Sequence, residues 1–179
     1  DEYTVASWLR TWYELYAKPS VRTATANRYQ LIIEQYTVPR IGSIKLKRLT
    51  TRHLQKLYKE LLESGRIHIG KNQSKGLSTT TVHSVHLMLH AVLDRAVKER
   101  LIPRNPCKYC VVPKPRKLDM KVLSPEQIGA YLESAQRREL LPMFYLELVS
   151  GLRKGELVAL RWDDLDVQGR TISVSRQYI

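Results

Sequence analysis

The sequence has little cysteine and no long apolar run, and both absences narrow the class of protein. The two cysteines, Cys107 and Cys110, are too close together to join distant parts of a fold, which fits a reducing compartment. No apolar run approaches the roughly 20 residues of a membrane-spanning helix, and the N-terminal stretch DEYTVASWLR is acidic, unlike a signal peptide. We therefore expect a soluble intracellular protein, and 43% hydrophobic residues are enough to build its core.

Motifs for several kinds of chemistry are also absent. The sequence contains no glycine-rich phosphate loop, no H-E-x-x-H and no G-x-S-x-G, so it gives no support to a nucleotide-binding or hydrolase function. Its single C-x-x-C could form a mixed zinc site with His83, His86 or His90, but we favour two small residues that pack after a helix, because no second C-x-x-C is present. The same histidines and Thr79 form a polar stripe that either faces solvent or reads a DNA groove.

The positive charge is large and unevenly distributed. The net charge is +13, and residues 1–121 carry 23 Lys and Arg against 9 Asp and Glu, whereas residues 122–179 carry 7 against 8. A positive field concentrated on one part of a protein is typical of nucleic-acid binding, because each neutralised phosphate releases counterions. A basic surface that serves only solubility is the other interpretation.

Apolar residues at helical spacing predict two helices at the start of the chain. The first, TVASWLRTWYELYA, is capped by Thr4, has Leu15 among its inward residues and stops near Pro19. The second runs through SVRTATANRYQLIIEQYTVPRIG and breaks at Pro39 and Gly42.

Two further helices are predicted before residue 101. The third, LTTRHLQKLYKELLESG, has Thr50 or Thr51 as its cap and Gly65 as its stop, and the fourth runs from about Ser78 to Arg100. The loop between them, SGRIHIGKNQSKG, is either a mobile connection or a segment that orders on a polyanion.

A change of composition near residue 112 predicts a linker and a second domain. Five prolines between residues 103 and 125 exclude a continuous helix, and a basic linker is placed at 112–121. Three helices are predicted after the linker. The first is SPEQIGAYLESAQRR, capped by Ser124, and the second is LLPMFYLELVSG, which is expected to be mostly buried. The third is LRKGELVALRWDDLD, with Trp162 on its apolar side. Gly169 marks a turn, and Ile172 and Val174 alternate with polar residues as in a strand.

Arg153 is in an unusual place for a cation. It lies at the start of the third of these helices, where the helix dipole disfavours positive charge by roughly 0.3–1 kcal/mol. An anion held between the guanidinium and the exposed N–H groups would interact favourably with both the cation and the helix start. Glu156 could then hold the arginine from the side opposite the anion. The alternative is an ordinary surface ion pair between residues three positions apart.

The stretch SGLRKGELVALRWDDLD resembles the first box of the tyrosine recombinases, or phage integrases, in which a T-G-x-R-x-x-E-x-x-x-L-x-W-x-D-I-type run supplies the first catalytic arginine. The stretches SVRTATANRYQLIIEQYTVPRIGSIKLKRLT and LIPRNPC resemble the core-binding domain of integrases from phages and conjugative transposons. The resemblance implies a mainly α chain: a SAM-like core-binding domain of four to five helices at 1–111, the linker at 112–121, and at 122–179 the first helices and first strand of an α+β catalytic domain.

By this resemblance Arg153 is the first active-site arginine and Glu156 the residue that positions it. The implied reaction is attack by a tyrosine on a DNA phosphodiester, through a 3′-phosphotyrosyl link, with no cofactor and no metal. A lysine, a His-x-x-Arg box, a second His or Trp and the nucleophilic tyrosine would lie beyond residue 179, and Tyr178 is not expected to be that nucleophile. We expect the chain to be a fragment that binds DNA without cleaving it.

Duplex DNA at attachment or recombination sites is the expected partner. The full protein is expected to form a tetramer on DNA in the bacterial cytoplasm, and accessory bending or excision factors are possible partners. The residues expected to contact DNA are polar or basic and lie on the second and fourth helices, the glycine-containing loop and the linker: Arg22, Thr25, Arg28, Lys71, Lys75, Thr79, Thr80, His83, Lys114, Arg116 and Lys117.

Two other functions stay open from the sequence. One is a non-catalytic DNA-binding protein, derived from an integrase, that occupies recombination sites. The other is an interaction module whose basic face meets an acidic protein. The second predicts binding that does not prefer duplex DNA over other polyanions.

Overall fold

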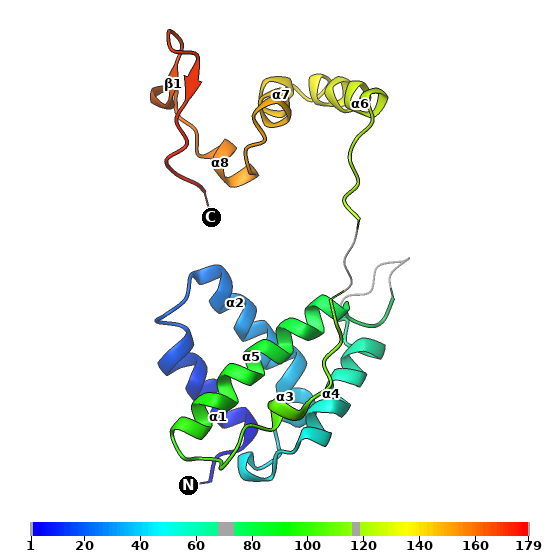
Figure 1. Cartoon of the computed structure of the whole chain (residues 1–179), viewed down its shortest axis with the longest axis vertical. Coiled ribbons are helices and arrows are strands. Elements are labelled where there is room, and N and C mark those ends of the chain that lie inside the picture. Colours follow the sequence, from blue (N-terminus) through cyan, green and yellow to red (C-terminus); the bar gives the residue numbers. More distant parts are fainter. Residues whose placement is uncertain (1, 68–73, 116–118, 179) are drawn as a thin grey trace. The chain divides into compact units, whose positions relative to one another are not determined.

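The computed structural model describes residues 2–67, 74–115 and 119–178. The chain divides into two compact units, Asp1–Leu118 and Asp119–Ile179 (Figure 1). The elements of the first unit in its described part are all helical, and the second unit combines helices with one small antiparallel sheet. The predicted fold class, a helical domain followed by the first elements of an α+β domain, is confirmed.

The first helix begins at a reciprocal cap. α1 (Val5–Trp12) continues into a π-helical turn, η1 (Tyr13–Ala17). The Thr4 hydroxyl accepts a hydrogen bond from the Ser7 N–H (3.1 Å), and the Ser7 hydroxyl accepts one from the Thr4 N–H (2.9 Å), so the predicted cap is confirmed. Leu15, predicted to point inward, is 63% exposed. The wider π turn shifts the residues after α1 around the helix axis, which straight α-helical spacing does not anticipate.

A second long helical run changes type before it ends. α2 (Thr23–Leu31) leads into the π-helical segment η2 (Ile32–Thr37) and then α3 (Val38–Ile41), with Gly42 at the end. The predicted stop at Gly42 is confirmed, whereas the predicted break at Pro39 is wrong because the chain stays helical through this residue.

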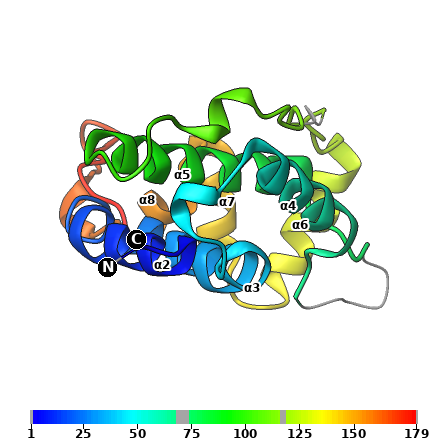
Figure 2. The same cartoon turned by 90° about the horizontal axis from the view of Figure 1, so that it is seen from below.

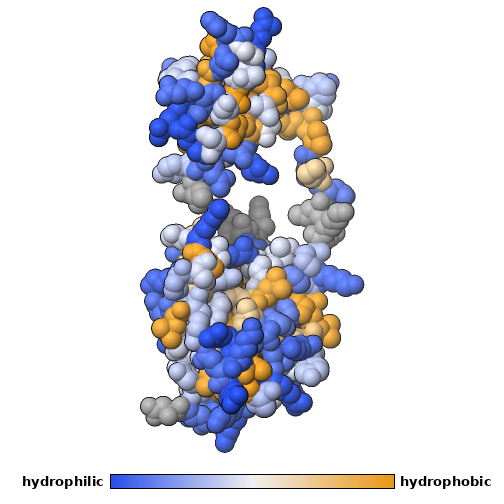
Figure 3. Space-filling view, turned by 60° about the vertical axis from the view of Figure 1, so that its left-hand side comes forward, coloured by the Kyte–Doolittle hydropathy of each residue, from blue (hydrophilic) through white to orange (hydrophobic). Residues whose placement is uncertain are grey.

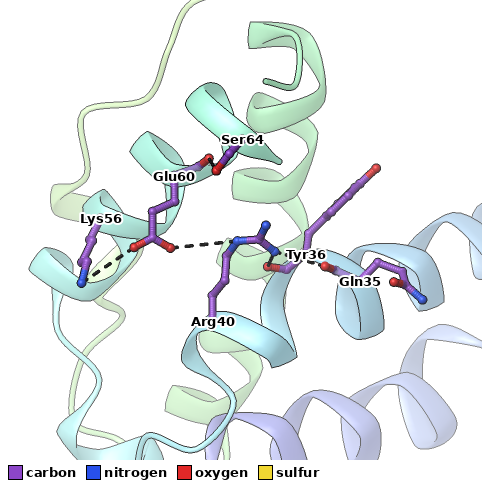
Figure 4. Close-up of polar contacts among 6 residues, drawn as sticks. All are labelled: Gln35, Tyr36, Arg40, Lys56, Glu60 and Ser64. Atoms are coloured by element: carbon purple, nitrogen blue, oxygen red, sulfur yellow. Dashed lines mark hydrogen bonds and ion pairs between the residues drawn. The ribbon is translucent and has the colours of Figure 1, made fainter. Parts of the chain in front are cut away.

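Arg40 explains why Pro39 does not end the helix. Proline has no N–H to donate to the preceding turn. The Arg40 guanidinium donates instead to the carbonyl oxygens of Gln35 (3.1 Å) and Tyr36 (3.0 Å), and it lies 4.0 Å from the carboxylate of Glu60 on the facing helix (Figure 4). The Arg40 side chain thus supplies to the Gln35 carbonyl the hydrogen bond that Pro39 cannot make.

The third and fourth predicted helices of the first unit begin and end close to where the sequence predicts. Thr50 caps the third predicted helix, Gly65 ends it, and Ser78 caps the fourth through a bond from the Thr81 N–H (3.1 Å). Figure 2 shows the longest helix on one side of the unit and α2 and α3 on the other. The elements are η3 (Leu46–Arg48), α4 (Thr51–Ser64), α5 (Thr79–Lys98) and η4 (Pro106–Tyr109).

The core of the first unit lies where α1 and α4 meet α5. Trp8 is 1% exposed, and its indole N–H donates to the carbonyl oxygen of Val92 in α5 (3.1 Å), so the large side chain is buried with its polar atom satisfied. The inward face predicted for α5 is confirmed, since all of its members are at most 2% exposed: Val82, Val85, Leu89, Val92, Leu93 and Ala96.

The second unit starts as predicted and then departs from prediction. Ser124 caps α6 (Pro125–Gln136), with its hydroxyl accepting from the Gln127 N–H (3.4 Å). α7 (Leu141–Ser150) contains no buried residue, which corrects the expectation of a mostly buried helix. Apolar side chains are therefore visible on the surface of this unit (Figure 3). The large exposed ones near α7 are Leu140, Met143, Tyr145, Leu148 and Val149.

The last predicted helix is much shorter than expected. α8 (Lys154–Val158) is followed by the 3₁₀ turn η5 (Trp162–Asp164), and Trp162 is 88% exposed rather than packed on the apolar side. The Asp164 carboxylate explains the change, because it accepts from the Arg161 N–H (2.8 Å) and thereby caps a new turn.

The predicted strand pairs with a second strand, which lies in the stretch that was predicted to be the end of the last helix. β1 (Leu165–Asp166) and β2 (Thr171–Ile172) are antiparallel. The predicted turn at Gly169 is confirmed, with its N–H donating to the Asp166 carboxylate (2.8 Å). Val174 lies beyond β2.

Candidate nucleic-acid interface

Arg153 is presented to solvent at the start of α8. It occupies the position before the first helical residue, with an extended backbone, and its carbonyl accepts from the Glu156 N–H (2.8 Å) and the Leu157 N–H (2.9 Å). Its side chain is 85% exposed. The guanidinium therefore lies at the positive end of the helix with most of its donors available to an anion.

Glu156 holds Arg153 through two contacts. One carboxylate oxygen accepts from the Arg153 backbone N–H (2.8 Å) and the other from its guanidinium (3.1 Å). The backbone bond, and then the guanidinium, keep the pKa of Glu156 below its ordinary value. The predicted three-residue pairing is thus present, and the carboxylate caps the helix start as well as orienting the cation.

Two glycines shape the backbone around this helix start. Gly151 ends α7 with φ of 65°, a left-handed conformation that a side chain would strain. A Cβ at Gly155 would lie 2.7 Å from the Tyr178 carbonyl oxygen, and the Gly155 carbonyl accepts from the Tyr178 N–H (2.8 Å). The segment after β2 therefore runs beside α8, within a few residues of Arg153.

Leu157 anchors α8, but Trp162 does not. Leu157 is 7% exposed, as expected for the apolar side of the helix, while Trp162 is the exposed residue described above.

The Asp164 carboxylate fixes the following turn through its ion pair with Arg176, beyond β2. Hydrogen bonding from the Arg161 N–H and this ion pair lower the pKa of Asp164. Sequence reasoning missed this pair, because no local spacing joins residues 164 and 176.

The structure brings together part of the predicted DNA-contact set on α2 and α5. Arg22 is exposed just before α2, where no side chain within the described residues caps the helix. Arg28, also exposed, donates to the hydroxyl of Ser84 on α5 (2.9 Å). The sixth residues of α2 and α5 therefore lie side by side. No sequence pattern pointed to Ser84 beyond its place one turn after Thr80.

Three other predicted residues lie in the first two turns of α5. Thr80 is exposed, and Thr79 and His83 are partly buried. The Nδ1 atom of His83 is buried and has no hydrogen-bond partner in the part of the chain that the structure describes. Thr25 is partly buried on α2.

The basic loop and linker residues are not joined to this surface by any described contact. Lys75 is exposed before α5, and Lys114 is exposed shortly after Val111, whose backbone bonds to Gln55 of α4 in both directions (2.9 and 3.0 Å). The other three predicted contacts lie outside the described residues: Lys71, Arg116 and Lys117.

Cys107 and His86, the middle residue of the histidine row His83, His86 and His90, both contact the hydroxyl of Tyr58. The Tyr58 hydroxyl lies 3.0 Å from Nδ1 of His86 and 3.9 Å from Sγ of Cys107, and burial raises the pKa of Cys107 to about 12. His90 pairs with Asp94 (3.2 Å). Within residues 2–67, 74–115 and 119–178, no three His, Cys, Asp or Glu residues are grouped so as to hold a metal ion. No helix of this part is long and apolar enough to cross a membrane.

Comparison with known proteins gives consistent matches. Residues 4–62 match the domain described as phage integrase, N-terminal SAM-like domain. An integrase of Saccharopolyspora erythraea is 27% identical over 176 residues, which are 97% of this chain and 38% of the relative. The ICEBs1 integrase of Bacillus subtilis is 32% identical over 124 residues, 68% of this chain and 30% of the relative. The chain thus spans well under half the length of these relatives.

Solved structures match the fold of nearly the whole chain. The Tn1549 transposon integrase, in complex with circular intermediate DNA, has a TM-score of 0.77 at 23% identity, over 98% of this chain and 55% of that one. A lambda integrase dimer bound to a core site has a TM-score of 0.76 at 17% identity, over 98% of this chain and 49% of that one. The fold is that of DNA integrases. The chain resembles tyrosine recombinases, or phage integrases, over nearly its whole length, and residues 4–62 match the SAM-like domain of that family.

Proposed function

We propose that this chain grips duplex DNA in site-specific recombination and that Arg153 binds the phosphate at which the strand is exchanged. The observation that carries the proposal is the geometry at α8, where an 85% exposed guanidinium is held by Glu156 at the positive end of a helix. The Glu156 carboxylate both caps the helix start and holds the guanidinium, so the cation is oriented before an anion binds.

The proposed chemistry proceeds through a 3′-phosphotyrosyl intermediate. Attack by a tyrosine gives a pentacoordinate phosphorane, which carries more negative charge than the phosphodiester. Fixed guanidinium donors stabilise that additional charge because they are already oriented when it develops. Arg153 would supply two such donors, with Glu156 as its positioning residue, and the covalent link would conserve the energy of the broken bond.

We assign DNA binding to the surface formed by the first turns of α2 and α5, with the basic linker at 112–121 as a further contact. Arg22 and Arg28 would contact phosphates and fix the register, and Thr25, Thr79, Thr80 and His83 could reach base edges. The bond between Arg28 and Ser84 supports this assignment, because it holds α2 beside α5 one turn beyond these residues of α5.

We also propose how the full protein assembles, which partners it has and where it acts. A related lambda integrase is known as a tetramer bound to a Holliday junction, and we propose a tetramer on DNA for the full protein. Accessory bending or excision factors are proposed partners, and the bacterial cytoplasm is the proposed place of action.

Duplex binding tests the proposal directly. Fluorescence anisotropy with a labelled duplex, over a salt series and with heparin as competitor, should show a Kd that rises steeply with salt. Arg22→Gln with Arg28→Gln should reduce the salt slope by about 2, since each lost phosphate contact removes about 0.9. The matched control, Arg137→Gln with Arg138→Gln, removes the same charge from the second unit and should leave the slope nearly unchanged.

Two results would contradict this account. Equal affinity for duplex DNA and for an unrelated polyanion such as polyglutamate would indicate an acidic protein partner. A covalent complex formed by this chain on a suicide duplex, and lost in Tyr178→Phe, would make Tyr178 the nucleophile and overturn the expectation that the isolated chain binds without cleaving.

A further inference from the structure

Three adjoining hollows form a second basic surface on the first unit. The central one has a volume of about 600 Å³ and lies between the start of α4 and the segment 102–109. It shares Lys47, Ile102 and Pro103 with a hollow of about 390 Å³ at the end of α5, and Arg52 with one of about 700 Å³ along α4. We call the three together the basic groove. Its cations are Lys47, Arg52, Lys56, Lys59, Arg100 and Arg104.

The charge of the basic groove is not neutralised locally. No Asp or Glu lines any of the three hollows among the described residues. Lys56 and Lys59 pair weakly with Glu60 and Glu63, each at 3.8 Å and near the surface. The other four cations form no ion pair within the described part of the chain: Lys47, Arg52, Arg100 and Arg104. Such a concentration of like charge destabilises the fold unless a polyanion covers it.

The cations are arranged in a row rather than around a point. Arg52, Lys56 and Lys59 follow one another at four and three positions on α4, which extends the row over about 10 Å. Lys47 and Arg104 continue it across the central hollow. A DNA strand carries one phosphate per 3.4 Å of helix axis. A linear polyanion therefore fits this surface better than a single small anion does.

The walls of the basic groove are fixed before any ligand binds. The Thr51 hydroxyl donates to the Pro106 carbonyl (2.9 Å), which ties α4 to the opposite wall. Asn105, 2% exposed, donates to the His90 carbonyl (3.0 Å) and to the Asp94 carboxylate (2.8 Å), which ties that wall to α5. A preorganised surface loses less conformational entropy on binding.

The basic groove lies far from the surface assigned to DNA above. α5 spans Thr79–Lys98, 20 residues, so its two ends are about 30 Å apart. Thr79 and Thr80 lie at its start, whereas Arg100 and Arg104 follow its end. A duplex that runs across the first turns of α2 and α5 would not also reach the basic groove, since only a duplex running along α5, over about nine base pairs, would span this distance.

We propose that the basic groove binds the phosphodiester backbone of a second DNA segment. The first unit would then hold two duplexes, one at each end of α5. This goes beyond the recombination chemistry and does not need Arg153. Phosphate contacts by Lys47, Arg52 and Arg104 would make the binding independent of sequence and steeply dependent on salt.

A DNA-bridging assay with the whole chain tests the proposal. One duplex is immobilised, protein is bound, and capture of a second, labelled duplex is measured in the presence of excess first duplex. Light scattering confirms that the protein is monomeric at the concentration used, so that a dimer cannot bridge. The groove variant carries Lys47→Gln, Arg52→Gln and Arg104→Gln, and the matched control carries Arg137→Gln, Arg138→Gln and Arg170→Gln. Circular dichroism verifies that each variant is folded.

The wild-type chain and the control should capture the second duplex, and the groove variant should still bind the immobilised duplex but capture at least about tenfold less of the second. Equal capture by the groove variant and the control would overturn the proposal. So would wild-type binding of one duplex without capture of another, which would leave the proposed function intact. A wild-type chain that binds no duplex at all would instead contradict the proposed function.

Discussion

At the scale of single residues, arginines have different roles in this protein because their surroundings differ. Arg153 and Arg40 are both close to a glutamate, yet Arg153 is 85% exposed while Arg40 is 22% exposed and donates to two backbone carbonyls. The first is exposed, and we propose that it meets a DNA phosphate, whereas the second stabilises the helix that it belongs to. Their sequence neighbourhoods did not separate these roles.

Arg40→Met should destabilise the first unit. The substitution removes the donors to the carbonyls of Gln35 and Tyr36 beside Pro39, and leaving such groups unsatisfied costs about 1–3 kcal/mol. Urea unfolding monitored by circular dichroism measures the loss. Lys56→Met, which removes a 77% exposed cation paired with the same Glu60, is the matched control and should change stability by less than about 0.5 kcal/mol.

A second substitution tests the physical cause. Pro39→Ala restores a backbone N–H, so Arg40→Met should cost less in that background than in the wild type. Equal costs in the two backgrounds would show that Arg40 does not compensate for the proline.

At the scale of elements, the histidine row of α5 couples the fold to pH. His86 is partly buried, faces the Tyr58 hydroxyl and lies between His83 and His90, with ring centroids 6.4 and 5.9 Å away. Burial, and then the two neighbouring histidines, lower the pKa of His86. Cys107 also faces Tyr58, and its raised pKa keeps it neutral near pH 7.

The stability of the first unit should therefore fall as the pH is lowered. Because the pKa of His86 is lower in the folded chain, the unfolded chain binds more protons at pH values between that folded pKa and about 6.5. The stability that the neutral His86 side chain contributes is fully present above about pH 6.5 and is lost progressively below it. Thermal unfolding followed from pH 7.5 to 5.5 should show a decreasing Tm, and His86→Gln should flatten the curve. An unchanged slope in His86→Gln would assign the pH dependence to other groups.

Local patterns predicted the elements of the first unit well, and the physical reason is specific. Thr4, Thr50 and Ser78 cap helices through bonds that span three residues, and bonds of this local kind can be recognised from the sequence. Trp162 and α7 were mispredicted because burial depends on what packs against an apolar side chain, and apolar spacing does not state whether a partner is there. The Asp164 carboxylate caps a new turn after α8, and the regular spacing of the leucines had predicted that the helix continued through this point.

At the scale of the whole molecule, the two units differ in how their apolar residues are used. The hydrophobic core of described residues lies in the first unit, from Val5 to Cys107, whereas Ala135 and Leu157 are the buried apolar residues of the second. The positive charge follows the same division, since the first 121 residues carry 23 Lys and Arg against 9 Asp and Glu. The Arg153–Glu156 pair was anticipated from motif and spacing, but the basic groove was not, because its cations come from three separate parts of the sequence.

The central claim is that Arg153 stabilises the phosphate at the point of strand exchange. It is tested most directly by strand cleavage in a recombinase that carries this chain together with the further segments of its relatives. Arg153→Lys keeps the charge but removes the planar fork of donors, and it should slow cleavage by about 100-fold with duplex affinity nearly unchanged. The adjacent, matched substitution Lys154→Gln should alter cleavage by only a few fold. Cleavage by Arg153→Lys at the wild-type rate would contradict the account.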